Sequence, residues 1–172
     1  GDAAAGAAAV AEMKKHFANH PRTRFFEAEL AFNAKDYKAT QEHMRPVVQA
    51  LPNNPLALQL AGAAEFRLGN VAQAETYLGK ALQQAPELPI ARSMLAQLYL
   101  RTGQPQKTLS TLDPLLRRNP GPGALQLAAE AHLQTGDAKQ AEELYQRAAR
   151  MKPDDPRIRT APTCASARST RR

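Results

Sequence analysis

The sequence contains few residues suited to covalent or metal chemistry. Cys164 is the only cysteine among 172 residues, and a disulfide framework or a thiolate metal site needs more than one thiol. Tryptophan is absent, aromatic residues amount to 5%, and Ala and Leu dominate the apolar 43%. Because Ala and Leu favour helices, whereas strands favour β-branched and aromatic residues, this composition predicts an all-α fold.

Long apolar runs are also missing. The uncharged stretch 3–11 is much shorter than the roughly 20 residues that a transmembrane helix needs. Asp2 occupies a place where a secretory leader carries basic residues. We therefore interpret the N-terminal segment as an ordinary helix and expect no direct membrane span in this chain.

Charge of one sign is concentrated only at the C-terminus. The formal net charge is +7, and Arg168, Arg171 and Arg172 supply three of these charges, which leaves +4 for the rest. The other Lys and Arg residues are spread singly, without the basic stripe and interleaved aromatics typical of nucleic-acid surfaces. We expect a solvated surface and no nucleic-acid partner.

The dominant positive feature is an internal repeat. Prolines recur at intervals of 34, 34 and 33 residues, and glycines at intervals of 34 and 33. These residues are Pro52, Pro86, Pro120 and Pro153, and Gly69, Gly103 and Gly136. One residue missing after Pro120 explains both shorter intervals, so the two series belong to one array of similar units.

The register of the repeat divides the chain. Four complete units are expected at 21–54, 55–88, 89–121 and 122–155. We expect residues 1–20 to form the second helix of a truncated preceding repeat, with an exposed alanine-rich face. Residues 156–161 are expected to start a truncated fifth repeat, and residues 162–172 to be a disordered tail or a cloning scar.

Each unit carries the signals of a helix, a turn and a second helix. Pro at position 1 favours a helix start, and Gly at position 15, replaced by Lys35 in the first unit, permits the left-handed conformation that ends a helix. Small residues recur where two antiparallel helices approach closely, namely Ala28, Gly62, Ala96 and Ala129 at position 8, and Thr40, Ala74, Thr108 and Ala141 at position 20. Pro46 and Pro114 fall inside second helices, where we expect kinks or early helix ends.

Residues 69–86 (GNVAQAETYLGKALQQAP) and 136–153 (GDAKQAEELYQRAARMKP) resemble the second helix of a tetratricopeptide (TPR) repeat. The interval separates the chain from HEAT and armadillo repeats, which need about 40 residues or more. The family's Trp at position 4 is absent, and its aromatic at position 11 survives only as Tyr99. The resemblance implies a right-handed α-α superhelix whose first helices line a concave groove for a peptide or a partner helix.

By this resemblance, four positions of each first helix face the groove. They hold Phe25, Glu29, Phe32, Asn33, Gln59, Ala63, Phe66, Arg67, Ser93, Gln97, Leu100, Arg101, Gln126, Glu130, Leu133 and Gln134. The apolar members, Phe32, Phe66, Leu100 and Leu133, form either inter-repeat core or a ligand groove, and their exposure decides between the two. Arg67 and Arg101 either contact an acidic partner or are solvated.

A narrower resemblance involves segments 20–39, 60–78 and 95–109. They are similar to the TPR lipoprotein of bacterial PEP-CTERM/exosortase systems, which is encoded with exopolysaccharide and protein-sorting genes. That resemblance implies a location in the Gram-negative cell envelope. The lipobox and signal of the family are not in this chain, so lipid anchoring rests on the resemblance alone.

No residue pattern indicates catalysis, a metal site or a cofactor. His16 and His20 have the spacing of a zinc pair, but no neighbouring acid completes the site and Pro21 ends the helix. We therefore expect a non-enzymatic scaffold that binds a protein or peptide. The alternatives are a structural spacer that self-associates end to end through its terminal helices, and an RNA-binding helical repeat.

Overall fold

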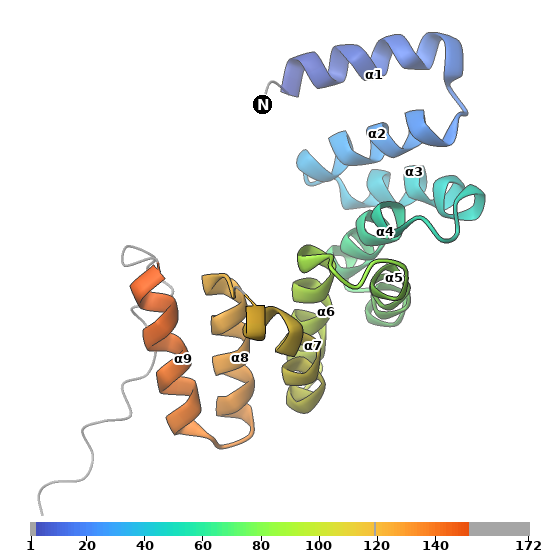
Figure 1. Cartoon of the computed structure of the whole chain (residues 1–172). Coiled ribbons are helices and arrows are strands. Elements are labelled where there is room, and N and C mark those ends of the chain that lie inside the picture. The colour runs from blue at the N-terminus through green and yellow to red at the C-terminus, as the bar shows by residue number, and fades with distance from the viewer. Residues whose placement is uncertain (1–2, 119, 152–172) are drawn as a thin grey trace, which may run out of the picture. The chain divides into compact units, whose positions relative to one another are not determined.

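The computed structural model describes residues 3–118 and 120–151. Within these ranges the chain forms nine α-helices and no strand (Figure 1), which confirms the all-α prediction. The helices are α1 (Ala3–Phe17), α2 (Pro21–Asn33), α3 (Tyr37–Ala50), α4 (Pro55–Leu68), α5 (Val71–Gln84), α6 (Pro89–Arg101), α7 (Pro105–Arg118), α8 (Pro122–Gln134) and α9 (Ala138–Met151). The segments 156–161 and 162–172, with Cys164, lie outside the described residues.

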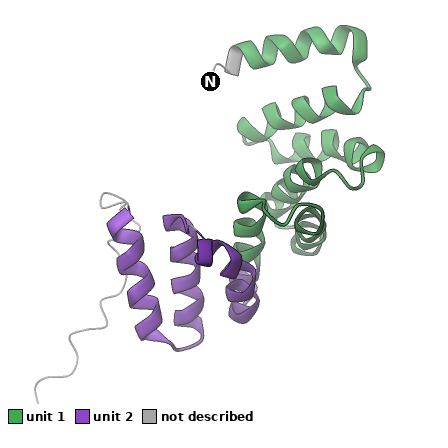
Figure 2. Cartoon of the chain, viewed as in Figure 1, with its two compact units in different colours: residues 1–98 green, residues 99–172 purple. Residues whose placement is uncertain are grey.

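Successive helices pack as pairs. Helix α2 packs against α3, α4 against α5, and α8 against α9, while α3 also contacts α4 and α7 contacts α8. The helices belong to two compact units, and the boundary between Leu98 and Tyr99 falls inside α6 (Figure 2). Each unit therefore contains at least one complete helical hairpin.

Proline and side-chain caps define where the helices begin. The first residue of α2, α4, α6, α7 and α8 is a proline, whose fixed φ suits a helix start and whose missing N–H is not needed there. Asn54 caps α4, because its Oδ1 accepts hydrogen bonds from the amides of Leu56 and Ala57 at 3.1 and 3.0 Å. These contacts satisfy N–H groups that have no partner inside the helix.

The turns at position 15 all adopt a left-handed backbone. The φ angles are 83°, 70° and 84° at the three glycines, and Lys35 adopts the same conformation with φ 63°. In all four turns the following amide donates to the carbonyl five residues earlier, as from Asp36 to Ala31 and from Asn70 to Glu65, both at 2.9 Å. This is the Schellman arrangement, and it confirms the predicted role of position 15.

The small residues at positions 8 and 20 are buried in all four repeats, as predicted. Gly62 on α4 shows why: a Cβ there would lie 2.7 Å from Cγ and 2.9 Å from Cδ2 of Leu78 on α5. Real Cβ atoms do not approach other atoms so closely, so α4 and α5 pack at their present separation only because position 62 has no side chain.

Of the two alternatives expected at Pro46 and Pro114, a kink or an early helix end, the early end does not occur. Helix α3 continues to Ala50 and α7 continues to Arg118. Both prolines are exposed, as are Glu42 and Ser110, the residues whose carbonyls lose an amide donor. Because these carbonyls belong to the solvent-facing side of each helix, water can replace the lost hydrogen bond and the helix need not end.

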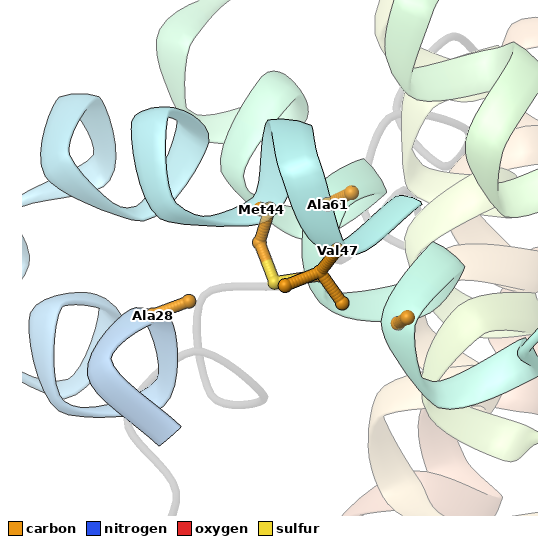
Figure 3. Packing of buried hydrophobic residues seen from close by; sticks show 5 residues of the cluster. Ala28, Met44, Val47 and Ala61 are labelled. Carbon is orange, nitrogen blue, oxygen red and sulfur yellow. The ribbon is translucent and has the colours of Figure 1, made fainter. Parts of the chain in front are cut away.

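A compact apolar cluster holds the first unit together. Met44 and Val47 of α3, each 1% exposed, pack with Ala28 of α2 and with Ala61 of α4 (Figure 3). Ala57 completes the cluster. Since α3 supplies the large side chains while α2 and α4 supply alanines, α3 joins the hairpins on its two sides.

Candidate partner-binding surface

An exposed guanidinium in the first unit lies over an aromatic ring, which in turn meets a second ring edge-on. The guanidinium carbon of Arg67 on α4 lies 5.8 Å from the ring centroid of Tyr37 on α3. The Tyr37 ring in turn meets Phe32 of α2 edge-on, with 5.3 Å between centroids. Arg67 has no acidic partner among the described residues, and its side chain is exposed. We name Phe32, Tyr37 and Arg67 the aromatic-arginine ledge.

Two neighbouring groove candidates add polar character to this surface. Asn33 follows Phe32 and is exposed. Glu29 lies one turn earlier on α2 and is partly buried, and burial raises the pKa of its carboxyl above the ordinary 4.5. Desolvation disfavours the charged carboxylate, so Glu29 contributes a weakly solvated acid to α2 one turn before Phe32.

Other groove candidates of the first unit have internal roles. Gln59 Oε1 accepts a hydrogen bond from the amide of Ala91 at 3.2 Å, which satisfies an N–H in the first turn of α6. Phe25 packs against the apolar cluster, and its ring meets Phe26 edge-on at 6.1 Å. Ala63 is buried, whereas Gln97 is exposed. Gln59 therefore caps α6, and Phe25 packs on the apolar cluster. These internal contacts explain both side chains without a partner protein.

Exposure separates the four members of the apolar stripe. Phe66 and Leu100 are buried, with 8% and 6% of their surface exposed. Phe32 is half-buried, and Leu133 is exposed at 36%. Burial supports the packing alternative for Phe66 and Leu100, because a side chain that the protein covers cannot line an open groove. Phe32 and Leu133 remain available to a ligand.

The second unit presents a different set of groove candidates. Arg101, Glu130 and Gln134 are exposed there, and Gln134 Nε2 donates to the Leu100 carbonyl at 3.4 Å. Nε2 of Gln126 is buried and has no hydrogen-bond partner among the described residues. Burial raises the pKa of Glu130, and it raises the pKa of Tyr145 on α9 together with the nearby Glu130 carboxylate.

Sequence reasoning missed Tyr37, the central residue of the ledge. The family pattern assigns groove positions to first helices, whereas Tyr37 is the first residue of a second helix, α3. A usable signal was present, because Tyr37 directly follows the N-cap Asp36, which accepts from the Ala39 amide. A residue at that boundary can point toward either helix of the hairpin.

The two histidines with zinc-like spacing have other contacts. His20 Nδ1 accepts from the Arg22 amide at 3.2 Å and so caps α2. His16 lies 3.9 Å from Glu12, so a neighbouring acid is present after all. No three His, Cys, Asp or Glu side chains come together as metal ligands in the described part of the chain. Among the same residues, no helix has the length and apolar character needed to cross a bilayer.

Comparison with known proteins identifies the repeat. Two family models, both described as tetratricopeptide repeat, match residues 31–98 and 93–156. No curated protein sequence matches the chain.

Solved structures share the fold at low sequence identity. A thermophilic TPR protein of Thermus thermophilus is 19% identical with a TM-score of 0.69, over 87% of this chain and 83% of that chain. YrrB, a TPR protein with an unusual peptide-binding site, is 17% identical with a TM-score of 0.74, over 86% and 76%. MamA from Desulfovibrio magneticus RS-1 is 18% identical with a TM-score of 0.75, over 81% and 80%. With family matches that together span residues 31–156 and helical hairpins throughout the described residues, the chain belongs to the tetratricopeptide repeat family.

Proposed function

We propose that this chain is a non-enzymatic scaffold that binds an acidic segment of a partner protein at the aromatic-arginine ledge. The observation that carries the proposal is the unpaired, exposed Arg67 held 5.8 Å above the Tyr37 ring. TPR proteins as a family bind proteins or peptides, which supports a protein partner.

The chemistry of the ledge fits a carboxylate on an extended segment. A guanidinium offers a planar pair of N–H donors that matches both oxygens of a carboxylate. Stacking on Tyr37 restricts the Arg67 side chain, so less conformational entropy is lost when a ligand binds. Half-buried Phe32 offers apolar contact beside the charge, and exposed Asn33 offers an amide to the ligand backbone.

The test is affinity capture from a bacterial envelope extract with the immobilised 172-residue chain. We expect Arg67→Ala to lose a partner that the unmodified chain retains. Arg22→Ala is the matched control, because Arg22 is also exposed and also lies 5.8 Å from a ring, that of Phe26, but is not part of the ledge. Equal capture by all three proteins would contradict the proposal.

We also propose that the protein works in a PEP-CTERM/exosortase system of the Gram-negative cell envelope. The similarity of segments 20–39, 60–78 and 95–109 to the TPR lipoprotein of those systems supports this. Fractionation of cells that express the natural full-length protein tests the location. Recovery in the cytosolic fraction alone would count against it.

The alternative role, self-association as a structural spacer, is supported by α1. Ala5, Ala8 and Ala9 on this helix are exposed, and Phe17 at its end is 62% exposed. Uncovered apolar helix faces favour association. Sedimentation of the chain and of Ala8→Glu separates the roles: a concentration-dependent dimer that Ala8→Glu abolishes supports the spacer.

A further inference from the structure

A cavity of about 390 Å³ opens among α3, α4 and α5 in the first unit. Its volume lies within the range of roughly 300–1,000 Å³ typical of ligand sites. None of the predicted groove residues lines it. Met44 and Ala61 contribute apolar wall, whereas Gln41, Glu65 and Asn70 contribute polar groups. The cavity is therefore separate from the aromatic-arginine ledge and calls for its own explanation.

Glu65 is the unusual member of this lining. Its side chain is only 6% exposed. Nε2 of Gln41 donates to both carboxylate oxygens, at 2.9 and 3.0 Å, and Nδ2 of Asn70 donates to Oε2 at 2.6 Å. All these donors are neutral amides. Among the described residues, no Lys, Arg or His lies within ion-pair distance of Glu65.

The other buried carboxylate of the same unit has basic side chains around it. Glu27 on α2 is 9% exposed, and Lys14 contacts it at 2.8 Å. Arg24 and His43 each lie 3.5 Å from its second oxygen. The two buried glutamates of this unit thus differ in their partners: Glu27 has Lys14 and Arg24 within ion-pair distance, whereas Glu65 has neutral amide donors and faces a cavity.

A buried carboxylate without a counter-charge carries a large desolvation cost. Amide donors reduce this cost and fix the direction of the carboxylate, but they supply no opposite charge. A carboxylate accepts about four hydrogen bonds, and Glu65 receives three contacts from two amides. Accepting capacity is left for a cationic donor that enters the cavity.

We propose that this cavity receives the guanidinium group of an arginine side chain on a partner protein, a second contact that rests on the proposed scaffold function. A guanidinium is less strongly hydrated than an ammonium and stacks on aromatic faces. The cavity offers it the Glu65 carboxylate, the Tyr77 ring and the amide oxygen of Gln73. Charge favours a cation, and the weaker hydration of a guanidinium together with the Tyr77 ring favours arginine over lysine.

Arg45 also lines the cavity and bears on the strength of binding. It is exposed and forms no ion pair with the described residues. Its charge opposes a second cation, so its removal is expected to tighten binding several-fold. This expectation distinguishes a cation site at Glu65 from an anion site at Arg45, for which the same change would abolish binding.

The test is a nuclear magnetic resonance titration of the 172-residue chain with methylguanidinium, using N-methylurea as the neutral probe of similar shape. We expect saturable shifts of the side-chain amide signals of Gln41 and Asn70 with methylguanidinium alone. Glu65→Gln is expected to weaken binding at least tenfold. Glu42→Gln, which removes an exposed carboxylate of α3 outside the cavity, is expected to change nothing.

A second arm compares a short peptide that contains arginine with the same peptide containing citrulline. The arginine peptide is expected to shift the same signals, and the citrulline peptide is not. Absence of saturable shifts with methylguanidinium, equal shifts with N-methylurea, or binding of methylguanidinium but not of the arginine peptide would each overturn the proposal.

Two further variants keep the test decisive. If Glu65→Gln does not fold, Arg45→Gln provides the result, because tighter binding supports the site and lost binding overturns it. Arg67→Ala is expected to leave the titration unchanged, so a failure here and a failure of the aromatic-arginine ledge are distinguishable.

Discussion

At the scale of single residues, Lys35 adopts a backbone conformation that suits glycine better. Its φ of 63° is similar to that of the glycines at the equivalent position of the other three repeats. A left-handed conformation costs an L-residue roughly 1–2 kcal/mol. The first hairpin accepts this cost because the amide that follows, from Asp36, still donates to Ala31.

Replacing Lys35 with glycine is expected to stabilise the chain. Relief of the left-handed conformation is partly offset by the greater freedom of glycine in the unfolded state, which leaves a net gain of roughly 0.5–1 kcal/mol. Urea denaturation measures the change. Lys80→Gly, inside α5, is the control and should destabilise by about 1 kcal/mol; stabilisation by both substitutions would contradict the argument.

Glu29 makes stability depend on pH. Burial raises the pKa of its carboxyl in the folded state above 4.5, so the folded state binds a proton more tightly than the unfolded state does. The free energy of unfolding therefore falls as the pH rises from 4.5, the ordinary pKa, through the raised pKa of the folded state. Ionised Glu29 then destabilises the fold at neutral pH. Glu29→Gln is expected to raise Tm near pH 7 and to have no effect below about pH 4.

Thermal melts of both proteins at several pH values check this expectation. Glu42→Gln is a suitable control because Glu42 is exposed on α3. A rise in Tm that is the same at every pH would show that the gain comes from something other than the ionisation of Glu29.

At the scale of elements, the separation of α4 and α5 depends on Gly62. We expect Gly62→Ala to destabilise the chain by roughly 1–3 kcal/mol, because the new methyl group overlaps Leu78. Gly79 on α5 is the matched control, since a Cβ there meets nothing within 4 Å. Gly79→Ala should stabilise by roughly 0.5–1 kcal/mol through helix propensity; opposite signs in urea denaturation are the decisive result.

The packing of the hairpin also decides whether a proline ends a helix. The sequence predicts a kink or an early helix end at Pro46 and Pro114, yet both helices continue for four more residues. Sequence alone locates the missing amide. Whether the unpaired carbonyl faces water or the core depends on the packing of the whole hairpin.

At the scale of the whole molecule, stability is expected to differ between α1 and α4. Helix α1 packs against α2 and buries Val10, but most of its described side chains are exposed. Helix α4 packs against both α3 and α5 and buries eight residues. In repeat proteins each helix is stabilised by its immediate neighbours, so α1 has the lower local stability in this chain.

Hydrogen exchange measures this difference. We expect the α1 amides to exchange at least about tenfold faster than those of α4, which corresponds to roughly 1.4 kcal/mol in opening free energy. Exchange at the same rate in both helices would show that the first unit opens as one cooperative body.

Most of the helical pattern was predictable from the sequence. The repeat interval, the prolines at helix starts and the small residues at positions 8 and 20 all indicated hairpins, and the described helices begin at Pro21, Pro55, Pro89 and Pro122. The candidate surface was only partly predictable. Arg67 and Phe32 came from the family pattern, but their partner Tyr37 did not, and the role of Glu65 was not visible at all.

The sequence by itself determined where the first helix of each repeat begins, that position 15 ends it, and which faces are small enough to meet. These properties follow from φ preferences and side-chain volume, which act over a few neighbouring residues. Only the tertiary structure decided that Phe66 and Leu100 are buried, that Arg67 lies over the Tyr37 ring, and that Glu65 lines a cavity with no described cation within ion-pair distance of its carboxylate. Those outcomes depend on how residues from different helices are rotated toward each other, and no spacing along the chain encodes that rotation.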